Sequence, residues 1–238
     1  MDSQSFTPIS EIGEFNLIKK ITKGVSLGQK ETKFGVGDDC SVLSFVKGTD
    51  HLMSADMLVE GVHFDSSYTP IKHLGYKAVA VNISDVCAMN GLPSHVLVSI
   101  GIPNKYSVEL IEQLYEGVRL ACKNYNVDLI GGDTTASSGG LVISVTVLGK
   151  TKSTQTTYRG GAKPNHLLVV SGSLGGSYLG LQILEREKMI FEQNMKSQPN
   201  LDEYREVLER QLKPEPRTDL VKKFKEINMV PSSMIDIS

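Results

Sequence analysis

The feature that most constrains the fold is the alternation of helix-type and strand-type hydrophobic patterns along residues 12–148. In some segments apolar residues recur every three or four positions, as on one face of a helix, and in others every second position, as in a half-buried strand. The expected helices cover residues 12–23, 70–90 and 107–125, and the expected strands follow Asp39 and cover residues 51–58, 95–102, 129–135 and 141–148. Interleaved elements of this kind predict an α/β or α+β domain built on a substantial sheet.

The helix expected at 70–90 carries an acid on its apolar face. Thr69 and Pro70 are typical of a helix start, and Gly91 ends the pattern. Asp85 falls in line with Ala78 and Val81 at helical spacing. A buried carboxylate without a partner is costly, so Asp85 needs a metal, a cation or several donors unless it lies at the exposed edge of the stripe.

The composition excludes several classes of function. Of the 238 residues, 40% are hydrophobic and 22% are charged, and the formal net charge is -2. This balance is typical of a globular protein and lacks the basic excess of proteins that bind nucleic acid or anionic membranes. Cys40, Cys87 and Cys122 are far apart, as expected for free thiols in a reducing compartment. No apolar run approaches the roughly 20 residues that span a membrane, so we expect a cytoplasmic protein.

Several aspartates lie beside glycines and hydroxyl residues at the expected ends of elements. Leu129 to Thr135 reads LIGGDTT, in which an apolar run delivers Asp133 next to glycines that allow a close approach of ligand to backbone. Asp39 lies in a glycine-flanked turn, and Asp56 ends a strand that also carries Ser54. Each of these motifs is also compatible with an ordinary solvated or capped turn.

The second part of the chain has a different organisation. We place a domain boundary within residues 151–164. The first domain then covers residues 1–150, and residues 151–238 are the first part of the second domain. A basic turn at 158–164 leads to an expected strand at 167–171, a glycine-rich bend at 172–177 and a helix at about 177–188. This order resembles a phosphate-binding arrangement, although the Walker pattern is absent and a tight strand–helix turn is an equal reading. Residues 188–225 are charged and helical, and an apolar strand is expected at 234–238.

If the aspartates converge, a countercharge is required. Two like charges 4 Å apart repel by about 4 kcal/mol at an effective dielectric constant of 20. Oxygen ligands without a His/Cys set favour hard cations, so Mg²⁺ is the natural partner. Several Mg²⁺ ions held by carboxylates are typical of phosphoryl transfer from a nucleotide.

The amino-acid sequences of these motifs resemble those of one known family. The segments GDDC (37–40), DMLVEGVHF (56–64), AVNISD (80–85), LIGGDTT (129–135), RGGAKP (159–164) and IDIS (235–238) are similar to thiamine-monophosphate kinase in order and spacing. The resemblance covers residues 14–238. Aminoimidazole-ribonucleotide synthetase, selenophosphate synthetase and hydrogenase-maturation proteins share the acidic pattern, but not the DMLVEGVHF and LIGGDTT wording.

The resemblance implies a set of site residues. No residue is expected to act as an acid or base. His63 matches a substrate contact. The positions that match magnesium ligands or lie beside them are Asp39, Ser54, Ala55, Asp56, Asp85, Asp133 and Asp236. The positions that match nucleotide contacts are Gly132, Asp133, Arg159, Ser238 and, more weakly, Tyr115. Ala55 stands where many members of the family have Thr, so only its backbone carbonyl is available to a metal.

The resemblance also implies an activity and an architecture. The activity is ATP-dependent phosphorylation of thiamine monophosphate to thiamine diphosphate by direct in-line transfer, with several Mg²⁺ ions. The architecture is an N-terminal mixed-sheet domain that pairs with a second subunit in a homodimer, followed by an α+β domain that we expect to be incomplete here. Because the family continues beyond IDIS with another aspartate, we expect a truncated chain that binds Mg-ATP with little or no steady-state turnover. The alternatives are a related ATP-dependent synthetase and a catalytically silent nucleotide-binding module.

Overall fold

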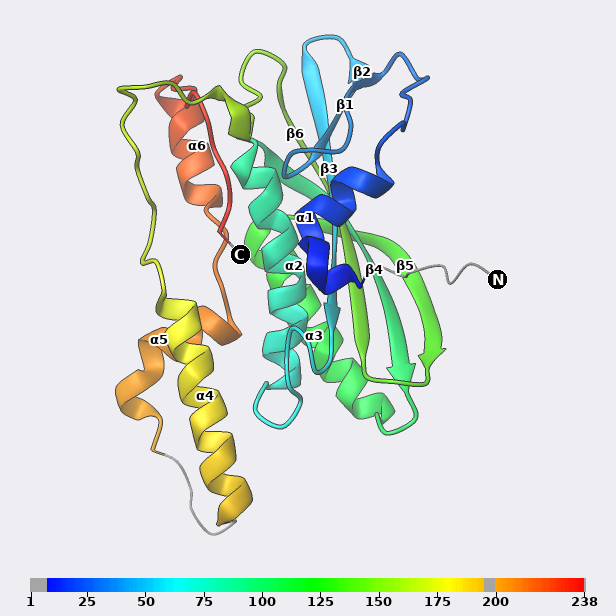
Figure 1. The fold of residues 1–238 in the computed structure, drawn as a ribbon, viewed down its shortest axis with the longest axis vertical. Coiled ribbons are helices and arrows are strands. Elements are labelled where there is room, and N and C mark those ends of the chain that lie inside the picture. Colours follow the sequence, from blue (N-terminus) through cyan, green and yellow to red (C-terminus); the bar gives the residue numbers. More distant parts are fainter. Residues whose placement is uncertain (1–7, 195–199, 238) are drawn as a thin grey trace.

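The fold is built on a six-stranded mixed sheet with the strand order β1-β2-β3-β6-β4-β5 (Figure 1). The computed structural model describes residues 8–194 and 200–237. The strands are β1 (Thr32–Phe34), β2 (Ser41–Val46), β3 (Thr49–Val59), β4 (Leu92–Pro103), β5 (Asp128–Ser137) and β6 (Val142–Lys152). Only β4 and β5 pair in parallel, and the other pairings within the sheet are antiparallel. The expected mixed sheet is therefore confirmed.

The register of the central strands decides which side chains meet the helices. β3 and β6 pair without interruption from Thr49 opposite Lys152 to Val59 opposite Val142. Successive side chains along a strand point to opposite faces of the sheet. Leu52 and Leu58 of β3 are buried, whereas Met57 is exposed. Even-numbered residues of this part of β3 therefore face the helical layer, and odd-numbered ones face away from it.

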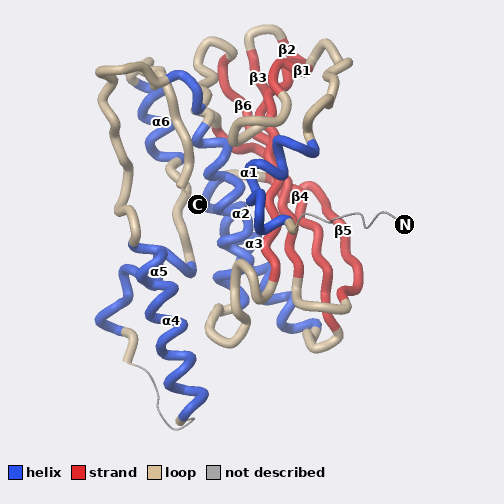
Figure 2. Tube along the Cα trace, viewed as in Figure 1, coloured by secondary structure: helices blue, strands red, loops and turns tan. Residues whose placement is uncertain are grey.

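Two helices, α2 (Ile71–Ala88) and α3 (Val108–Tyr125), run alongside the sheet as a helical layer (Figure 2). They approach each other very closely, because glycines lie at their crossing. A Cβ atom on Gly75 would lie 1.9 Å from the carbonyl oxygen of Leu114, and one on Gly117 would lie 1.9 Å from that of Lys72. This close packing fixes α2, which carries Asp85, against β3 and β6.

The remaining elements lie outside this layer. They are the kinked helix α1 (Ile9–Ile21), the 3₁₀ turns η1 (Arg159–Gly161) and η2 (Asp202–Tyr204), and the helices α4 (Gly176–Gln193), α5 (Arg205–Leu212) and α6 (Thr218–Glu226). The group α4 to α6 is joined to α2 by polar contacts. The Nζ of Lys77 donates to the carbonyl of Gln211 at 3.0 Å, and the hydroxyl of Tyr76 donates to Glu215 at 2.8 Å. The second part of the chain is thereby held beside the helix that carries Asp85.

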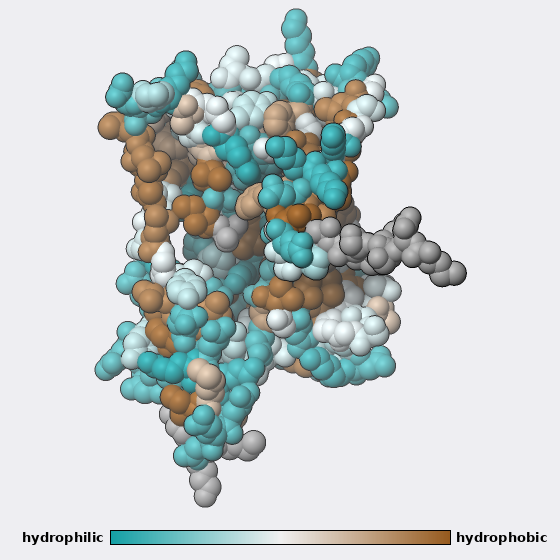
Figure 3. Space-filling view, viewed as in Figure 1, coloured by the Kyte–Doolittle hydropathy of each residue, from teal (hydrophilic) through white to brown (hydrophobic). Residues whose placement is uncertain are grey.

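Two expected strands are absent from the described residues. Residues 167–171 are extended but unpaired, and Leu167 and Leu168 are 92% and 95% exposed. The apolar pattern was a correct sign of an extended chain, but a strand also needs a hydrogen-bonded neighbour. Figure 3 shows this apolar segment along one edge of the molecule. Residues 234–237 are likewise extended without being a strand, and Ser238 lies outside the described residues.

Two smaller expectations also differ from the structure. The short edge strand β1 begins at Thr32, before the first strand expected from the sequence, which follows Asp39. Helix α2 begins at Ile71 with Pro70 as its N-cap residue and no side-chain cap, so Thr69 is one position further from the helix than expected. The charged helical region at 188–225 is interrupted between α5 and α6, where Pro214 and Pro216 lie.

The other composition-based expectations concern cysteines and membranes. Cys40, Cys87 and Cys122 are buried free thiols. Among the described residues, none of the helices combines the length and the apolar character needed to cross a membrane.

Candidate acidic metal and nucleotide site

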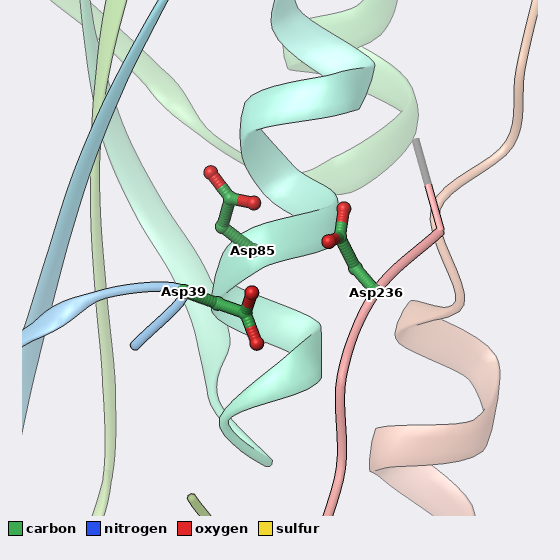
Figure 4. Close-up of side chains that lie close together, drawn as sticks. All are labelled: Asp39, Asp85 and Asp236. Atoms are coloured by element: carbon green, nitrogen blue, oxygen red, sulfur yellow. The ribbon is translucent and has the colours of Figure 1, made fainter. Parts of the chain in front are cut away.

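Three aspartates from distant parts of the sequence converge beside α2. Asp39, Asp85 and Asp236 each place a carboxylate oxygen within 4.8 Å of those of the other two. Figure 4 shows Asp85 on α2, Asp39 on the turn before β2 and Asp236 on the extended segment that ends the described chain. We call these three residues the acidic cluster. The convergence expected from sequence is therefore present for these three residues.

Local interactions hold each member of the acidic cluster in place. Asp85 lies on the buried face of α2, and the hydroxyl of Ser54 on β3 donates to its Oδ2 at 2.6 Å. The backbone N–H of Cys40, the residue after Asp39, points to the sulfur of Met89 at 3.1 Å. Asp236 is brought in by the segment 231–237, whose Met234 N–H donates to the carbonyl of Tyr158 at 3.3 Å. The cluster thus depends on contacts between three separate segments.

The electrostatics of the cluster indicate a missing positive charge. Burial, with smaller contributions from Asp56, Asp236 and Asp39, raises the pKa of Asp85 from 3.8 to about 8 despite the hydrogen bond from Ser54. Burial also raises the pKa of Asp39, against the opposing effect of Arg159, and Asp236 raises it further. The pKa of Asp56 is raised by burial and then by Asp236. Four carboxylates therefore interact unfavourably when ionised.

The donor set fits a hard divalent cation. Oδ2 of Asp39 and Oδ2 of Asp236 are buried, yet neither has a hydrogen-bond partner within the described residues. An unsatisfied buried carboxylate oxygen is costly, and a cation bound by these oxygens removes the cost. Carboxylate oxygens that converge in this way are suitable ligands for Mg²⁺, which prefers oxygen donors and retains several waters.

Asp56, Ser54 and Ala55 lie next to the cluster on β3. Ser54 and Asp56 are on the face of the sheet that meets α2, and the backbone N–H of Asp56 donates to the side-chain oxygen of Asn82 at 3.0 Å. Ala55 is exposed and pairs with Thr146. Because its side chain points to the other face of the sheet, the missing Thr hydroxyl of Ala55 would not have faced Asp85.

Arg159 lies directly on the acidic turn. Its guanidinium contacts Asp39, and its Nε lies 3.6 Å from an oxygen of Asp38. Its backbone N–H donates to the other oxygen of Asp38 at 3.1 Å. The turn η1 therefore provides a cation to the pair Asp38-Asp39, in a position from which a guanidinium can also reach a nearby phosphate.

Asp133 and the neighbouring glycine lie elsewhere on the sheet. They are on β5, three strands away from β3, which corresponds to about 14 Å at the usual strand spacing. Here Gly132, Asp133 and Thr134 line a hollow of about 430 Å³ together with Tyr115 of α3. The structure thus brings together the expected nucleotide contacts Gly132, Asp133 and Tyr115, but separates Asp133 from the acidic cluster.

The backbone at Gly132 can be formed only by glycine. Its φ angle is +156°, and a Cβ atom would lie 1.7 Å from the carbonyl oxygen of Val98 on β4. Gly131 has a similar φ of +154° but meets only the side chain of Leu97, at 3.3 Å. The two glycines therefore allow β5 to adopt an unusual extended backbone directly beside the hollow.

The chain is similar to known proteins of one family. Residues 37–151 match the family "AIR synthase related protein, N-terminal domain". The chain is 40% identical over 174 residues to thiamine-monophosphate kinase of Bacillus subtilis (strain 168), covering 73% of this chain and 53% of that protein. It is also 38% identical over 184 residues to the Aquifex aeolicus (strain VF5) protein of the same name, covering 77% of this chain and 56% of the other.

A solved structure decides the family. The structure of AaThiL complexed with AMPPCP and TMP superposes with a TM-score of 0.83 and 33% identity, covering 99% of this chain and 69% of that one. The chain belongs to the thiamine-monophosphate kinase family. It spans about half the length of the curated thiamine-monophosphate kinases that it matches.

Two residues implied by the thiamine-monophosphate kinase resemblance remain to be placed. His63 lies in the turn after β3, and its Nδ1 accepts a hydrogen bond from the backbone N–H of Val59 at 3.0 Å. It is close enough to Asp56 to influence the pKa of that carboxyl. Ser238 is outside the described residues.

Two residues that support the acidic cluster, Asp38 and Asn82, were not among the site residues expected from the sequence. Asp38 accepts the Arg159 backbone N–H and also that of Asp39, the latter at 3.0 Å. Asn82 connects α2 to β3 by accepting from Asp56, and its amide nitrogen donates to the carbonyl of Ala78 at 2.9 Å. Asn82 lies three residues before Asp85 and hence on the same face of the helix, which was a usable signal.

Proposed function

We propose that the protein phosphorylates thiamine monophosphate to thiamine diphosphate by direct, in-line transfer of the γ-phosphate of ATP, with Mg²⁺ ions as cofactors. The observation that carries the proposal is the acidic cluster, in which carboxylates from three distant segments meet with buried, unpartnered oxygens. Family membership supports the choice of substrates, because AaThiL was solved with AMPPCP and TMP.

The chain's own residues have separate tasks in this proposal. Asp39, Asp85 and Asp236 would hold Mg²⁺, with Asp56 and Ser54 beside them on β3. When bound, the metal ions neutralise the negative charge of the phosphate oxygens and align them for transfer. Transfer between two phosphates needs no side chain to form a covalent intermediate, so the protein's contribution is positioning and electrostatic stabilisation.

The nucleotide is proposed to lie between the acidic cluster and the hollow on β5. The exposed backbone at Gly132 and the side chain of Tyr115 would contact the nucleotide, and Asp133 would hold a metal ion bound to it. Arg159 would contact a phosphate. His63, which lies near Asp56, would contact thiamine monophosphate.

We also propose that the working unit is a homodimer formed through the N-terminal domain. Met57 and Ile130 are 53% and 54% exposed on central and edge strands of the sheet. Exposed apolar residues mark an interface where they join into a contiguous patch, and the family resemblance implies a homodimer. Sedimentation velocity should give twice the monomer mass, and a monomer at micromolar concentration would contradict this part of the proposal.

The test of the reaction is a single-turnover experiment with protein in excess of ATP, thiamine monophosphate and Mg²⁺. We expect thiamine diphosphate to form slowly, as detected by oxidation to fluorescent thiochrome diphosphate, and to be absent without Mg²⁺ or in Asp85→Asn. Mg-dependent binding of AMPPCP without product would instead support the silent nucleotide-binding module. Conversion of ATP without thiamine diphosphate would support a related synthetase.

A further inference from the structure

The side chain of Arg159 forms an ion pair with Asp39, one of the three carboxylates of the acidic cluster. Its guanidinium is bound to Oδ1 of Asp39 and lies near Asp38. The side chains of both aspartates are only 4% exposed, whereas that of Arg159 is 37% exposed. A half-exposed cation therefore neutralises two buried anions at the place where the proposed function requires a metal.

The backbone of Arg159 is held independently of its side chain. The hydroxyl of Ser233 donates to the carbonyl of Arg159 at 2.6 Å. Two residues further on, a Cβ atom on Gly161 would lie 1.8 Å from the carbonyl oxygen of Ser232. The guanidinium can therefore leave Asp39 by side-chain rotation alone, without moving η1 or the segment that carries Asp236.

Asp39 is shared between the guanidinium and the acidic cluster. Oδ1 is bound to Arg159, while Oδ2 is buried and unpartnered on the same carboxylate. A carboxylate already paired with a guanidinium is a weaker metal ligand, and the guanidinium charge repels a divalent cation nearby. Both effects weaken the binding of a metal ion to Asp39.

We propose that Arg159 is an internal counter-cation that competes with the metal for Asp39 and is released to the phosphates of the nucleotide when the metal binds. This inference rests on the proposed function for the identity of the metal and the nucleotide. It explains how the chain tolerates a buried acidic cluster before ligands arrive, and it couples metal binding to nucleotide binding.

The effect on metal binding distinguishes a counter-cation from a residue that only contacts nucleotide. Replacing a residue that only contacts nucleotide leaves metal binding unchanged when no nucleotide is present. Replacing a counter-cation tightens it. We expect Arg159→Gln to bind Mn²⁺ roughly fivefold more tightly than the wild type without nucleotide, as follows from a partly exposed ion pair of about 1 kcal/mol. The same variant should bind AMPPCP more weakly.

The experiment is a titration with Mn²⁺, a hard cation that replaces Mg²⁺, in which free Mn²⁺ is measured by electron paramagnetic resonance without nucleotide. Lys163→Gln is the matched control, because it removes one positive charge four residues further along the chain. Arg159→Lys keeps the charge but loses the planar fork that contacts both aspartates, so it should lie between the wild type and Arg159→Gln. Asp85→Asn, alone and combined with Arg159→Gln, shows that the measured ion is at the acidic cluster.

The outcomes separate the inference from the proposed function. Tighter binding in Arg159→Gln, but not in Lys163→Gln, supports the inference. Equal or weaker binding in Arg159→Gln overturns it while leaving the metal site in place. Equal tightening in Lys163→Gln also overturns it, because the effect would then be one of general charge. Failure of the wild type and all variants to bind Mn²⁺ would overturn both the inference and the metal site. Thermal unfolding of each variant checks that it is folded.

Discussion

Replacing Asp85 by Asn should stabilise the metal-free protein. Asp85 has a folded-state pKa of about 8 against an unperturbed value of 3.8. At pH 7 the buried carboxyl must hold a proton that the unfolded chain releases, and pH 7 lies about 3 units above the unperturbed pKa. With about 1.4 kcal/mol for each unit, the cost is about 4 kcal/mol. Asn avoids this cost and retains an oxygen for the hydroxyl of Ser54.

The expected gain in the free energy of unfolding is about 2 to 4 kcal/mol, since the side chain relaxes in part. The direction of the Asp85 pKa shift also determines how the stability of the metal-free protein depends on pH. Because the folded pKa lies above the unfolded one, the folded state binds more protons between the two values. The stability of the metal-free wild type should therefore fall as the pH rises from about 4 to about 8. The stability of Asp85→Asn should fall less steeply over the same range.

The assay is urea unfolding, monitored by circular dichroism, in buffers with a chelator and again with Mg²⁺. Mg²⁺ should stabilise the wild type by binding to the folded state, and Asp85→Asn should lose this effect. Asp65→Asn is the control of opposite sign, because Lys188 and the hydroxyl of Ser67 hold the pKa of Asp65 at about 2 against its burial. A loss of stability in metal-free Asp85→Asn, or an undiminished effect of Mg²⁺ on it, would refute the reasoning.

Two further predictions concern the framework of the site. Gly132→Ala should weaken the packing of β5 on β4 and abolish AMPPCP binding, because its Cβ clashes with the carbonyl oxygen of Val98. Gly131→Ala should lower the free energy of unfolding by only about 1–3 kcal/mol, through backbone strain. Equal unfolding midpoints for the two variants would contradict this. Glu60 accepts hydrogen bonds from Lys105, Ser66 and the backbone N–H of Leu141, which together outweigh burial and hold its pKa at about 2. Its stabilising contribution is therefore present above pH 4.5 and is lost as the pH falls toward 2, so Glu60→Gln should show a shallower acid-unfolding curve than the wild type.

The parts of the fold that could be predicted are those with strong local patterns. In residues 107–125 the apolar side chains recur at helical spacing after Ser107. Helix α3 begins at Val108, and the Ser107 hydroxyl accepts a hydrogen bond from the backbone N–H of Leu110. The alternation at 141–148 became β6, the strand between β3 and β4. In these segments the hydrophobic period and the capping residue favour the same structure.

The errors arise where the structure depends on a partner rather than on the local pattern. Leu167 to Val170 has a strand-type composition, but the described residues provide no neighbour for it, so it stays extended and exposed. The sequence grouped Asp133 with the other aspartates because its motif is similar, yet the strand order puts β5 at the edge of the sheet, away from the acidic cluster. Strand order depends on long-range pairing, which the local sequence does not specify.

The acidic cluster was predictable in its members but not in its electrostatics. Asp85 on an apolar helical face was visible in the sequence as a carboxylate that needs a partner, whereas Asp39 in its glycine-flanked turn was also compatible with a solvated turn. The position of Arg159 on Asp39 was not visible, because it depends on η1 being held by Ser233 from the far end of the described chain. The domain boundary at 151–164 remains a prediction.

The measurement that tests the central claim most directly is isothermal titration of this chain with AMPPCP, with and without Mg²⁺. The proposed site predicts binding that depends on Mg²⁺ and is strongly weakened in Asp133→Asn and in Asp85→Asn. Binding that is unchanged by chelation of Mg²⁺, or no binding in either condition, would contradict the assignment of these aspartates to a magnesium–nucleotide site.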